Sequence, residues 1–304
     1  MSPQRTWTIL ILLAAAALAG LGALQAVGAQ APAAQPAALT QPEAPSRPEI
    51  IRGIVASSVK VILGRQQQGA LDDLQSSSGV VIYSEETPQP WSLVLTNAHA
   101  VSATNLPEGL GLYVSYLTQT GRRVLPAKVS ACGNPKTVDL ALVRVEGVAL
   151  SPAQFEQMDQ VQLGSPVLVA SSPFGRELSI TSGIVSQLYL SGPPAMETTC
   201  SRQEKFCLDP KPLEEIFKTD APICYGSSGG GVFLASTGKL VGLVESYQTA
   251  DIVFRPKPGE EYKIQIPVPG ESFLISANKI KYFLEQNSLS LQGPKVLLSS
   301  QRDS

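Results

Sequence analysis

Two serines set among four glycines are the residues of this chain whose types and spacing best suit covalent chemistry. They lie in segment 219–233, which reads Thr-Asp-Ala-Pro-Ile-Cys-Tyr-Gly-Ser-Ser-Gly-Gly-Gly-Val-Phe. Glycine adopts backbone conformations that a Cβ forbids, so a serine in such a turn can present its Oγ beside converging backbone N–H groups. This arrangement suits an acyl-transfer nucleophile next to an oxyanion hole. A flexible Gly/Ser loop between strands has the same composition, so other parts of the chain must decide between the two.

Two further residues complete a hydrolytic set. His99 is the only histidine and follows an apolar run in Leu-Thr-Asn-Ala-His-Ala-Val, and Asp139 begins the run Asp-Leu-Ala-Leu-Val-Arg-Val. Taken alone, each is an ordinary core, surface or turn residue. Their order along the chain, with Ser228 last, is that of the chymotrypsin-type triad and differs from the subtilisin and α/β-hydrolase orders.

Short strands are the elements that must position these residues. The 25 glycines and 24 prolines are spread widely, which suits many strands joined by turns. We expect a polar surface loop at 66–78, no helix in the first half of the folded region, and strands at 54–63, 79–83, 92–96, 110–117, 123–130, 140–145, 166–170, 178–190, 240–246, 252–254 and 262–266. This pattern implies an all-β antiparallel sandwich or barrel. Ser276 is expected to cap a single helix over 277–286, with its apolar stripe at Ile280, Phe283 and Leu284.

Composition excludes several function classes. The formal charge is −2 without a basic block, which argues against nucleic acid as a partner. A single histidine excludes a multi-histidine metal site, and the four cysteines lack the paired spacing of a zinc site. Cys200 and Cys207 are close enough in sequence for a local disulfide in an oxidising compartment, with two free thiols as the alternative. Cys132 and Cys224 would then remain for a second bridge.

The N-terminus indicates export. Arg5 precedes a nearly all-apolar run over 7–24, and Val27-Gly28-Ala29 offers small residues for a signal peptidase. We expect cleavage after Ala29, with retention of 1–29 as a membrane anchor as the alternative. The composition of the Pro/Ala-rich stretch 30–48 predicts an extended tether, so we expect the folded part to begin near Glu49. The export signal places this folded part outside the cytoplasm. The polar tail 288–304 is assigned no function.

Several motifs, taken together, resemble the trypsin-like clan of serine proteases. The histidine and aspartate motifs above are similar to those of the clan, and Gly-Ser-Ser-Gly-Gly-Gly at 226–231 is similar to its Gly-Asn-Ser-Gly-Gly-Pro. The HtrA/Deg branch of exported bacterial serine proteases is the most similar. Ser-Pro-Phe-Gly at 172–175, followed by Ile-Thr-Ser-Gly-Ile-Val-Ser at 180–186, resembles a strand pair of that branch. Thr-Asp-Ala-Pro-Ile at 219–223 resembles the segment that precedes its nucleophile. The resemblance covers about 54–286.

The resemblance implies a protease domain over 49–287 with two six-stranded antiparallel β-barrels, at about 49–150 and 151–275, and a short C-terminal helix at about 276–287. The active site would lie between the barrels. Ser228 would attack the peptide carbonyl, His99 would transfer the proton, and Asp139 would orient the imidazole. The oxyanion would be bound by backbone N–H groups of Gly226 and Ser228, with Ser227 between them. Substrates would be unfolded or flexible polypeptides, and no metal or organic cofactor would be required.

By the same resemblance, an S1 pocket accepting small or medium apolar residues would be lined by Pro222, Ile223, Leu243, Val244 and Glu245. The sequence departs from the family pattern around the nucleophile, at Cys224, Tyr225, Ser227 and Gly231. We expect no PDZ domain in this chain. HtrA proteins commonly form trimers, so the resemblance allows a trimer, but the N-terminal segment gives no basis for carrying it over and the oligomeric state is left open. The departures leave open a protease-fold binding or scaffold protein with little turnover, and a different serine hydrolase such as an esterase is a weaker alternative.

Overall fold

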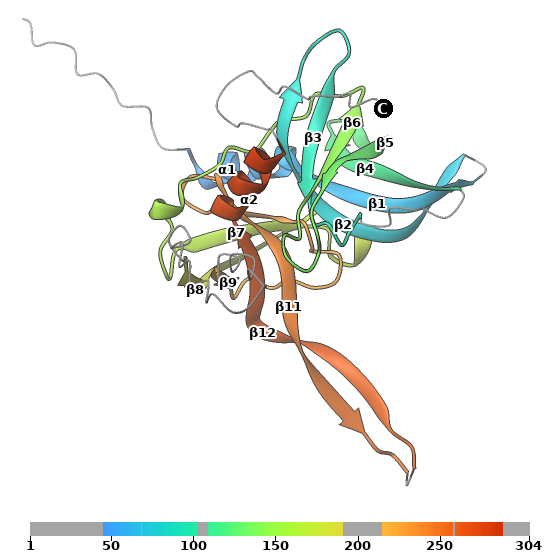
Figure 1. The fold of residues 1–304 in the computed structure, drawn as a ribbon, viewed down its shortest axis with the longest axis vertical. Helices are drawn as coiled ribbons and strands as arrows, with labels where there is room; N and C mark the ends of the chain where they lie inside the picture. The colour runs from blue at the N-terminus through green and yellow to red at the C-terminus, as the bar shows by residue number, and fades with distance from the viewer. Residues whose placement is uncertain (1–44, 68, 102–108, 191–214, 258, 288–304) are drawn as a thin grey trace, which may run out of the picture. The chain divides into compact units, whose positions relative to one another are not determined.

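Two closed six-stranded antiparallel barrels follow one another along the chain (Figure 1). The computed structural model describes residues 45–67, 69–101, 109–190, 215–257 and 259–287. The prediction of two six-stranded barrels followed by a short helix is confirmed. Closing each sheet on itself leaves no unpaired barrel edge, which suits short strands joined by turns.

The first barrel has the strand order β1-β2-β3-β6-β5-β4. Its core is a cluster of mostly β-branched side chains that face inward, including Val61, Val94 and Val143. Every residue of β3 is buried, because one face meets this core and the other meets the second barrel and the helices. The strands are β1 (Ser58–Gln67), β2 (Ala70–Glu85), β3 (Trp91–Thr96), β4 (Leu110–Thr118), β5 (Gly121–Cys132) and β6 (Ala141–Glu146).

The second barrel has the strand order β10-β11-β12-β9-β8-β7. Two single 3-10 turns, η1 (Met158–Gln160) and η2 (Pro173–Gly175), flank its first strand. Phe217, Val232 and Val244 are part of its core. The strands are β7 (Pro166–Ser171), β8 (Ser179–Tyr189), β9 (Ile216–Thr219), β10 (Gly231–Leu234), β11 (Leu240–Phe254) and β12 (Tyr262–Ser276).

The first described element is a helix, α1 (Arg47–Ser57), and the expectation of a strand from residue 54 and of no helix here was wrong. Ser46 and Glu49 form a capping box, in which the Ser46 N–H donates to Glu49 Oε2 at 2.8 Å. The β-branched residues that suggested a strand include Ile54, which is buried among the residues between the two barrels. Strand β1 begins at Ser58. Tertiary burial and the cap therefore outweigh the β-propensity of this segment.

The polar stretch 66–78, expected to be a surface loop, is instead the end of β1 and most of β2. Its residues pair across the β1–β2 hairpin from Gln67 with Ala70 to Lys60 with Ser78. Most of the side chains near the tip of this hairpin are exposed, so the strands there need no apolar face.

The C-terminal helix α2 (Ala277–Gln286) confirms the predicted element. The Ser276 Oγ accepts a hydrogen bond from the Lys279 N–H at 3.2 Å, which makes Ser276 the N-cap. Ile280, Phe283 and Leu284 are buried in a cluster that also includes residues of both barrels and of α1. The helix therefore helps to hold the two barrels together.

Candidate active site

His99 and Asp139 meet because their strands are neighbours. In the antiparallel pair β3–β6, Thr96 at the end of β3 lies opposite Ala141 at the start of β6. His99 comes three residues after Thr96, and Asp139 comes two residues before Ala141. The pairing therefore places two residues that are forty positions apart at the same edge of the first barrel.

The Asp139 carboxylate fixes the His99 imidazole with two hydrogen bonds. The backbone N–H of His99 donates to Asp139 Oδ1 at 2.8 Å, and the ring Nδ1 lies 2.6 Å from Oδ2. Asn97 supports the arrangement by donating from Nδ2 to the Asp139 carbonyl oxygen at 2.8 Å. An ionised carboxylate only accepts, so Nδ1 carries the proton and Nε2 is left with a free lone pair.

The hydrogen bond that His99 donates to Asp139 raises the pKa of His99, and the negative charges of Asp139 and Glu245 raise it further. Partial burial of the imidazole acts in the opposite direction. Glu245 is itself affected: burial and the nearby charge of Asp139 raise the pKa of its carboxyl, against the opposing charges of Lys279 and His99. The charged groups around the imidazole therefore include a second carboxyl besides Asp139.

Ser228 lies in a tight turn just before β10. Gly226 and Gly229 on either side have φ values of +85° and +81°, a region that favours glycine. A Cβ on Gly226 would lie 2.7 Å from the Ser172 carbonyl oxygen. The Ser228 Oγ donates to the Glu245 carbonyl oxygen at 3.5 Å and forms no hydrogen bond with His99 in the described part of the chain. The structure thus pairs His99 with Asp139 and turns the Ser228 hydroxyl toward β11.

The two peptide planes flanking Gly226 are fixed by hydrogen bonds from outside the turn. The Tyr225 carbonyl accepts from the Phe174 N–H at 2.7 Å, and the Gly226 carbonyl accepts from Ser78 Oγ at 2.7 Å. Because N–H and C=O point in opposite directions in a trans peptide, the Gly226 N–H points away from Phe174. Across the described ranges, neither the Gly226 N–H nor the Ser228 N–H donates to another protein group. Two backbone donors next to the serine are thus free to bind a ligand.

Ser78 of β2 connects the nucleophile turn to the first barrel. Its backbone N–H donates to the Ser228 carbonyl oxygen at 2.8 Å, while its Oγ contacts Gly226 and accepts from the Ser172 N–H at 2.8 Å. Thr96 Oγ1 in turn donates to the Ser78 carbonyl oxygen at 2.8 Å. Sequence reasoning missed this role, because a serine among three consecutive serines gives no signal of a contact made across 148 residues.

The η2 turn that holds Tyr225 is supported by a buried lysine. Lys60 Nζ donates to the Gly175 carbonyl oxygen at 2.7 Å and to Asp73 Oδ2 at 2.6 Å. Phe174 within this turn has a φ of +54°, which is unusual for a residue with a side chain. Pairing with Asp73 compensates for burying the ammonium group, and the lysine holds the carbonyl end of the turn in place.

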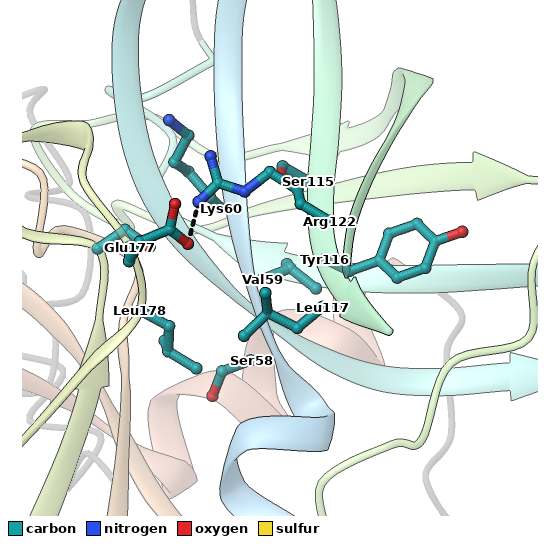
Figure 2. Close-up of a pocket in the computed structure, with 10 residues that line it drawn as sticks. Ser58, Val59, Lys60, Ser115, Tyr116, Leu117, Arg122, Glu177 and Leu178 are labelled. Carbon is teal, nitrogen blue, oxygen red and sulfur yellow. Dashed lines mark ion pairs between the residues drawn. The ribbon is translucent and has the colours of Figure 1, made fainter. Parts of the chain in front are cut away.

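Lys60 also borders a pocket between strands of the first barrel and the segment after η2 (Figure 2). Arg122 of β5 and Glu177 form an ion pair across it. The pocket includes none of the predicted catalytic residues. It is lined by Ser58, Val59, Lys60, Ser115, Tyr116, Leu117, Arg122, Ser172, Glu177 and Leu178.

Ser227, the family departure beside the nucleophile, is buried and stabilises the turn from inside. Its Oγ accepts from the Cys224 N–H at 3.2 Å and from Ser171 Oγ at 3.2 Å, and its N–H donates to the Cys224 carbonyl at 3.0 Å. The exposed ring of Tyr225 meets Tyr247 of β11 edge-on, with centroids 5.6 Å apart. These contacts give the turn a support of its own.

The residues predicted for an S1 pocket are divided between core and surface. Leu243 belongs to the cluster between the barrels, and Ile223 and Val244 belong to the core of the second barrel. Pro222 is exposed, and Glu245 is partly buried beside Ser228. The β11 backbone runs against the nucleophile turn, where the Gly229 N–H donates to the Val244 carbonyl at 2.9 Å. Their role in substrate binding stays a prediction.

The cysteines form no disulfide in the part of the chain that the structure describes. Cys132 is exposed, Cys224 is partly buried, and both are free thiols, so the suggested bridge between them is wrong. Burial raises the pKa of both thiols. Cys200 and Cys207 lie outside the described residues, so their predicted bridge stays a prediction.

Two features are absent from the described ranges. No helix within them is long and apolar enough to cross a membrane. No group of three or more His, Cys, Asp or Glu side chains within them is arranged to hold a metal ion. The predicted export signal at 1–29 and the tether up to residue 44 lie outside these ranges.

Comparison with known proteins places this geometry in context. The model of the trypsin-like peptidase domain matches residues 77–243, which include His99, Asp139 and Ser228. The chain is 31% identical over 188 residues to the serine protease PepD of Mycobacterium tuberculosis, an alignment covering 62% of this chain and 35% of PepD. It is 28% identical over 178 residues to the serine protease Do-like HtrA of Lactobacillus helveticus, covering 58% of this chain and 37% of that protein.

A third relative is the periplasmic pH-dependent serine endoprotease DegQ of Escherichia coli. It is 29% identical to the chain over 167 residues, which cover 55% of this chain and 30% of DegQ. The chain spans about a third of the length of these three relatives.

Proposed function

Because the chain belongs to the trypsin-like peptidase family, a family of serine-type peptidases, we propose that Ser228, His99 and Asp139 form a catalytic triad that hydrolyses peptide bonds. The observation that carries the proposal is the 2.6 Å contact between His99 Nδ1 and Asp139 Oδ2, with the Ser228 turn linked to the same barrel through Ser78. A histidine with a fixed tautomer near a serine in a glycine-rich turn suits nucleophilic catalysis.

In the proposed mechanism, the Ser228 Oγ leaves the Glu245 carbonyl and rotates toward His99 Nε2. It then attacks the substrate carbonyl carbon while Nε2 takes its proton, which gives a tetrahedral oxyanion and an imidazolium. The imidazolium returns the proton to the leaving amine, and the acyl-enzyme forms. Water attacks the acyl-enzyme by the same route, which releases the acid and restores Ser228.

Asp139 acts by keeping the Nδ1 proton in place and by stabilising the imidazolium. Its side chain is only 6% exposed, so water competes weakly for the carboxylate. The raised pKa of His99 is the equilibrium measure of this preference for the charged ring. The same interaction favours the transition state, in which the imidazole gains a proton.

The Gly226 and Ser228 N–H groups would bind the oxyanion, with Ser227 between them. The Tyr225 carbonyl accepts from the Phe174 N–H at 2.7 Å, and the Ser227 carbonyl accepts from the Gly230 N–H at 2.9 Å. These contacts support the role, because each carbonyl shares a peptide plane with one of the two donors and holds it before any substrate arrives. Donors that need no reorientation contribute most to stabilising a developing charge, and losing one typically costs about 3 kcal/mol of barrier. The nucleophile turn therefore has the fixed geometry that this role requires.

The substrates we propose are unfolded or flexible polypeptides outside the cytoplasm, as part of protein quality control. Relatives described as periplasmic serine proteases support the location, as does the predicted export signal. For the residue at the cleavage site, we propose small or medium apolar side chains, because Pro222 and Ile223 precede the nucleophile turn where a basic-specific enzyme would need an acidic group.

One observation favours a second function, that of a binding or scaffold protein with little turnover. The Ser228 hydroxyl contacts the Glu245 carbonyl instead of His99, and a serine held in that position would not be deprotonated. Hydroxyl rotation is a low-barrier change, and hydrogen bonds among catalytic groups often tighten only with substrate. The two functions therefore differ in whether Ser228 reacts.

A fluorophosphonate probe tests the proposal, because it labels only a serine that a nearby base activates. We expect the full chain to be labelled, and we expect Ser228→Ala and His99→Ala to lose the label while keeping the same thermal unfolding. Casein digestion would then separate a protease from an esterase: a protease requires that the wild type digests casein and the two variants do not. A folded wild-type protein that takes up no probe would refute the triad and favour the scaffold function.

A further inference from the structure

Strands β11 and β12 extend well beyond the second barrel as a two-stranded arm (Figure 1). Their barrel halves pair with β10 and β9, whereas residues 249–254 and 262–267 pair only with each other within the described ranges. We call residues 249–267 the arm. A hairpin without a third strand or a covering element is at best marginally stable in water.

One face of the arm is apolar, and the opposite face is mostly polar. Side chains directly opposite each other in an antiparallel pair share a face, and the register pairs Ala250 with Ile266, Ile252 with Ile264, and Phe254 with Tyr262. These six residues form what we call the apolar face. The opposite face carries Thr249, Asp251, Val253, Lys263, Gln265 and Pro267.

The apolar face is open to solvent. Its five large side chains are between 38% and 58% exposed: Ile252, Phe254, Tyr262, Ile264 and Ile266. Together they expose on the order of 500 Å² of surface, which is as much as the largest apolar patch on a typical monomer. A surface of this size on a hairpin that lacks other support indicates a contact with another molecule.

The charges of the arm are already balanced within it. Lys263 Nζ lies 2.7 Å from Asp251 Oδ2, and Arg255 Nη2 lies 2.9 Å from Glu261 Oε2. The sequence 249–267 has three acidic and three basic residues, so the arm has no net charge. The arm therefore lacks the excess of basic groups that binding to a nucleic acid or an anionic lipid surface needs.

We propose that the apolar face packs against the same face of a second copy of this chain, which makes the arm a dimerisation element. The two faces match in polarity and size because they are identical, as a two-fold contact requires. Face-to-face packing would bury at most about 1,000 Å² in total, near the lower limit of specific interfaces. It would also supply the second sheet layer that a lone hairpin lacks. The inference does not depend on the catalytic role of Ser228.

Sedimentation velocity on the full chain tests the proposal over about a hundredfold range of protein concentration. We expect the wild-type mass to double with concentration and Ile252→Ser/Ile264→Ser to stay at the mass of one chain. The matched control is Val253→Ser, which removes a 43% exposed apolar side chain from the opposite face and should still dimerise. All three proteins keep the same N-terminus, so association through that segment would leave the double variant associated.

A wild type that stays monomeric over the whole range, or a double variant that still dimerises, would overturn the proposal. If the double variant fails to fold by circular dichroism, Ile252→Lys and Ile252→Glu decide instead. Each should be monomeric alone and the two should form dimers when mixed, because like charges repel and unlike charges attract across the two-fold contact. Absence of mixed dimers would reject the face-to-face contact, and the apolar face would then be tested as a surface for polypeptide substrates.

Discussion

Replacing Asp139 by asparagine tests the proposed triad most directly, because the two side chains have the same shape. Asp139 accepts two hydrogen bonds from His99, one from the backbone N–H at 2.8 Å and one from Nδ1 at 2.6 Å. An asparagine has one carbonyl oxygen to offer and one NH₂ group that only donates. Since the backbone N–H cannot change role, the amide oxygen stays with it and the NH₂ group faces Nδ1.

The consequence is a change of tautomer. His99 Nδ1 must then accept, its proton moves to Nε2, and Nε2 can no longer take the proton of Ser228. In triads of this type the loss is about 10⁴-fold in kcat, or about 5 kcal/mol of barrier. We expect a loss of that order for Asp139→Asn with little change in KM, because Asp139 is not expected to touch the substrate.

The assay is cleavage of a fluorogenic peptide, with thermal unfolding measured on the same samples. Asp159→Asn is the matched control, since Asp159 is an exposed carboxylate of η1 that makes no contact with His99, and it should keep full activity. A folded Asp139→Asn protein within about tenfold of the wild-type kcat would refute the argument from the tautomer.

The contacts made by Glu245, Ser78 and Ser276 also have measurable consequences. Glu245→Gln should lower the pKa of His99, because a negative charge that raises this pKa is lost. The acidic limb of the pH profile of kcat/KM should then move to lower pH. A midpoint of that limb that stays the same or rises would contradict the prediction. Ser78→Ala frees the Gly226 carbonyl and should lower kcat by about 10-fold or more with KM nearly constant, as measured by peptide cleavage. Ser276→Ala removes the N-cap of α2 and the hydrogen bond from Ser276 Oγ to the Glu215 carboxylate. It should lower the free energy of unfolding by about 1 kcal/mol or more in a denaturant titration, without affecting kcat.

The sequence predicted the fold class because its signals are local. Short runs of β-branched residues between glycine- and proline-containing turns indicate strands wherever their partners lie. The order of His99, Asp139 and Ser228 is likewise a property of the chain alone. The capped helix after Ser276 was predictable for the same reason, since an N-cap and an apolar stripe need no distant contact.

The same local signals failed where distant contacts decide the conformation. Residues 54–57 have the composition of a strand but lie in α1, where Ile54 is buried between the two barrels. Residues 66–78 look like a loop but form a hairpin whose exposed side chains need not be apolar. In both cases the environment of a side chain, and not its type, determines the secondary structure.

What the sequence determined by itself was which residues could do chemistry, because residue type and order are written in the chain. Only the tertiary structure decided how they meet. The β3–β6 register brings His99 to Asp139, and Ser78 links the first barrel to the turn of Ser228. The tertiary structure also directs the Ser228 hydroxyl to the Glu245 carbonyl and leaves one face of the arm uncovered. These features depend on pairings between residues far apart in sequence, and no short motif encodes such contacts.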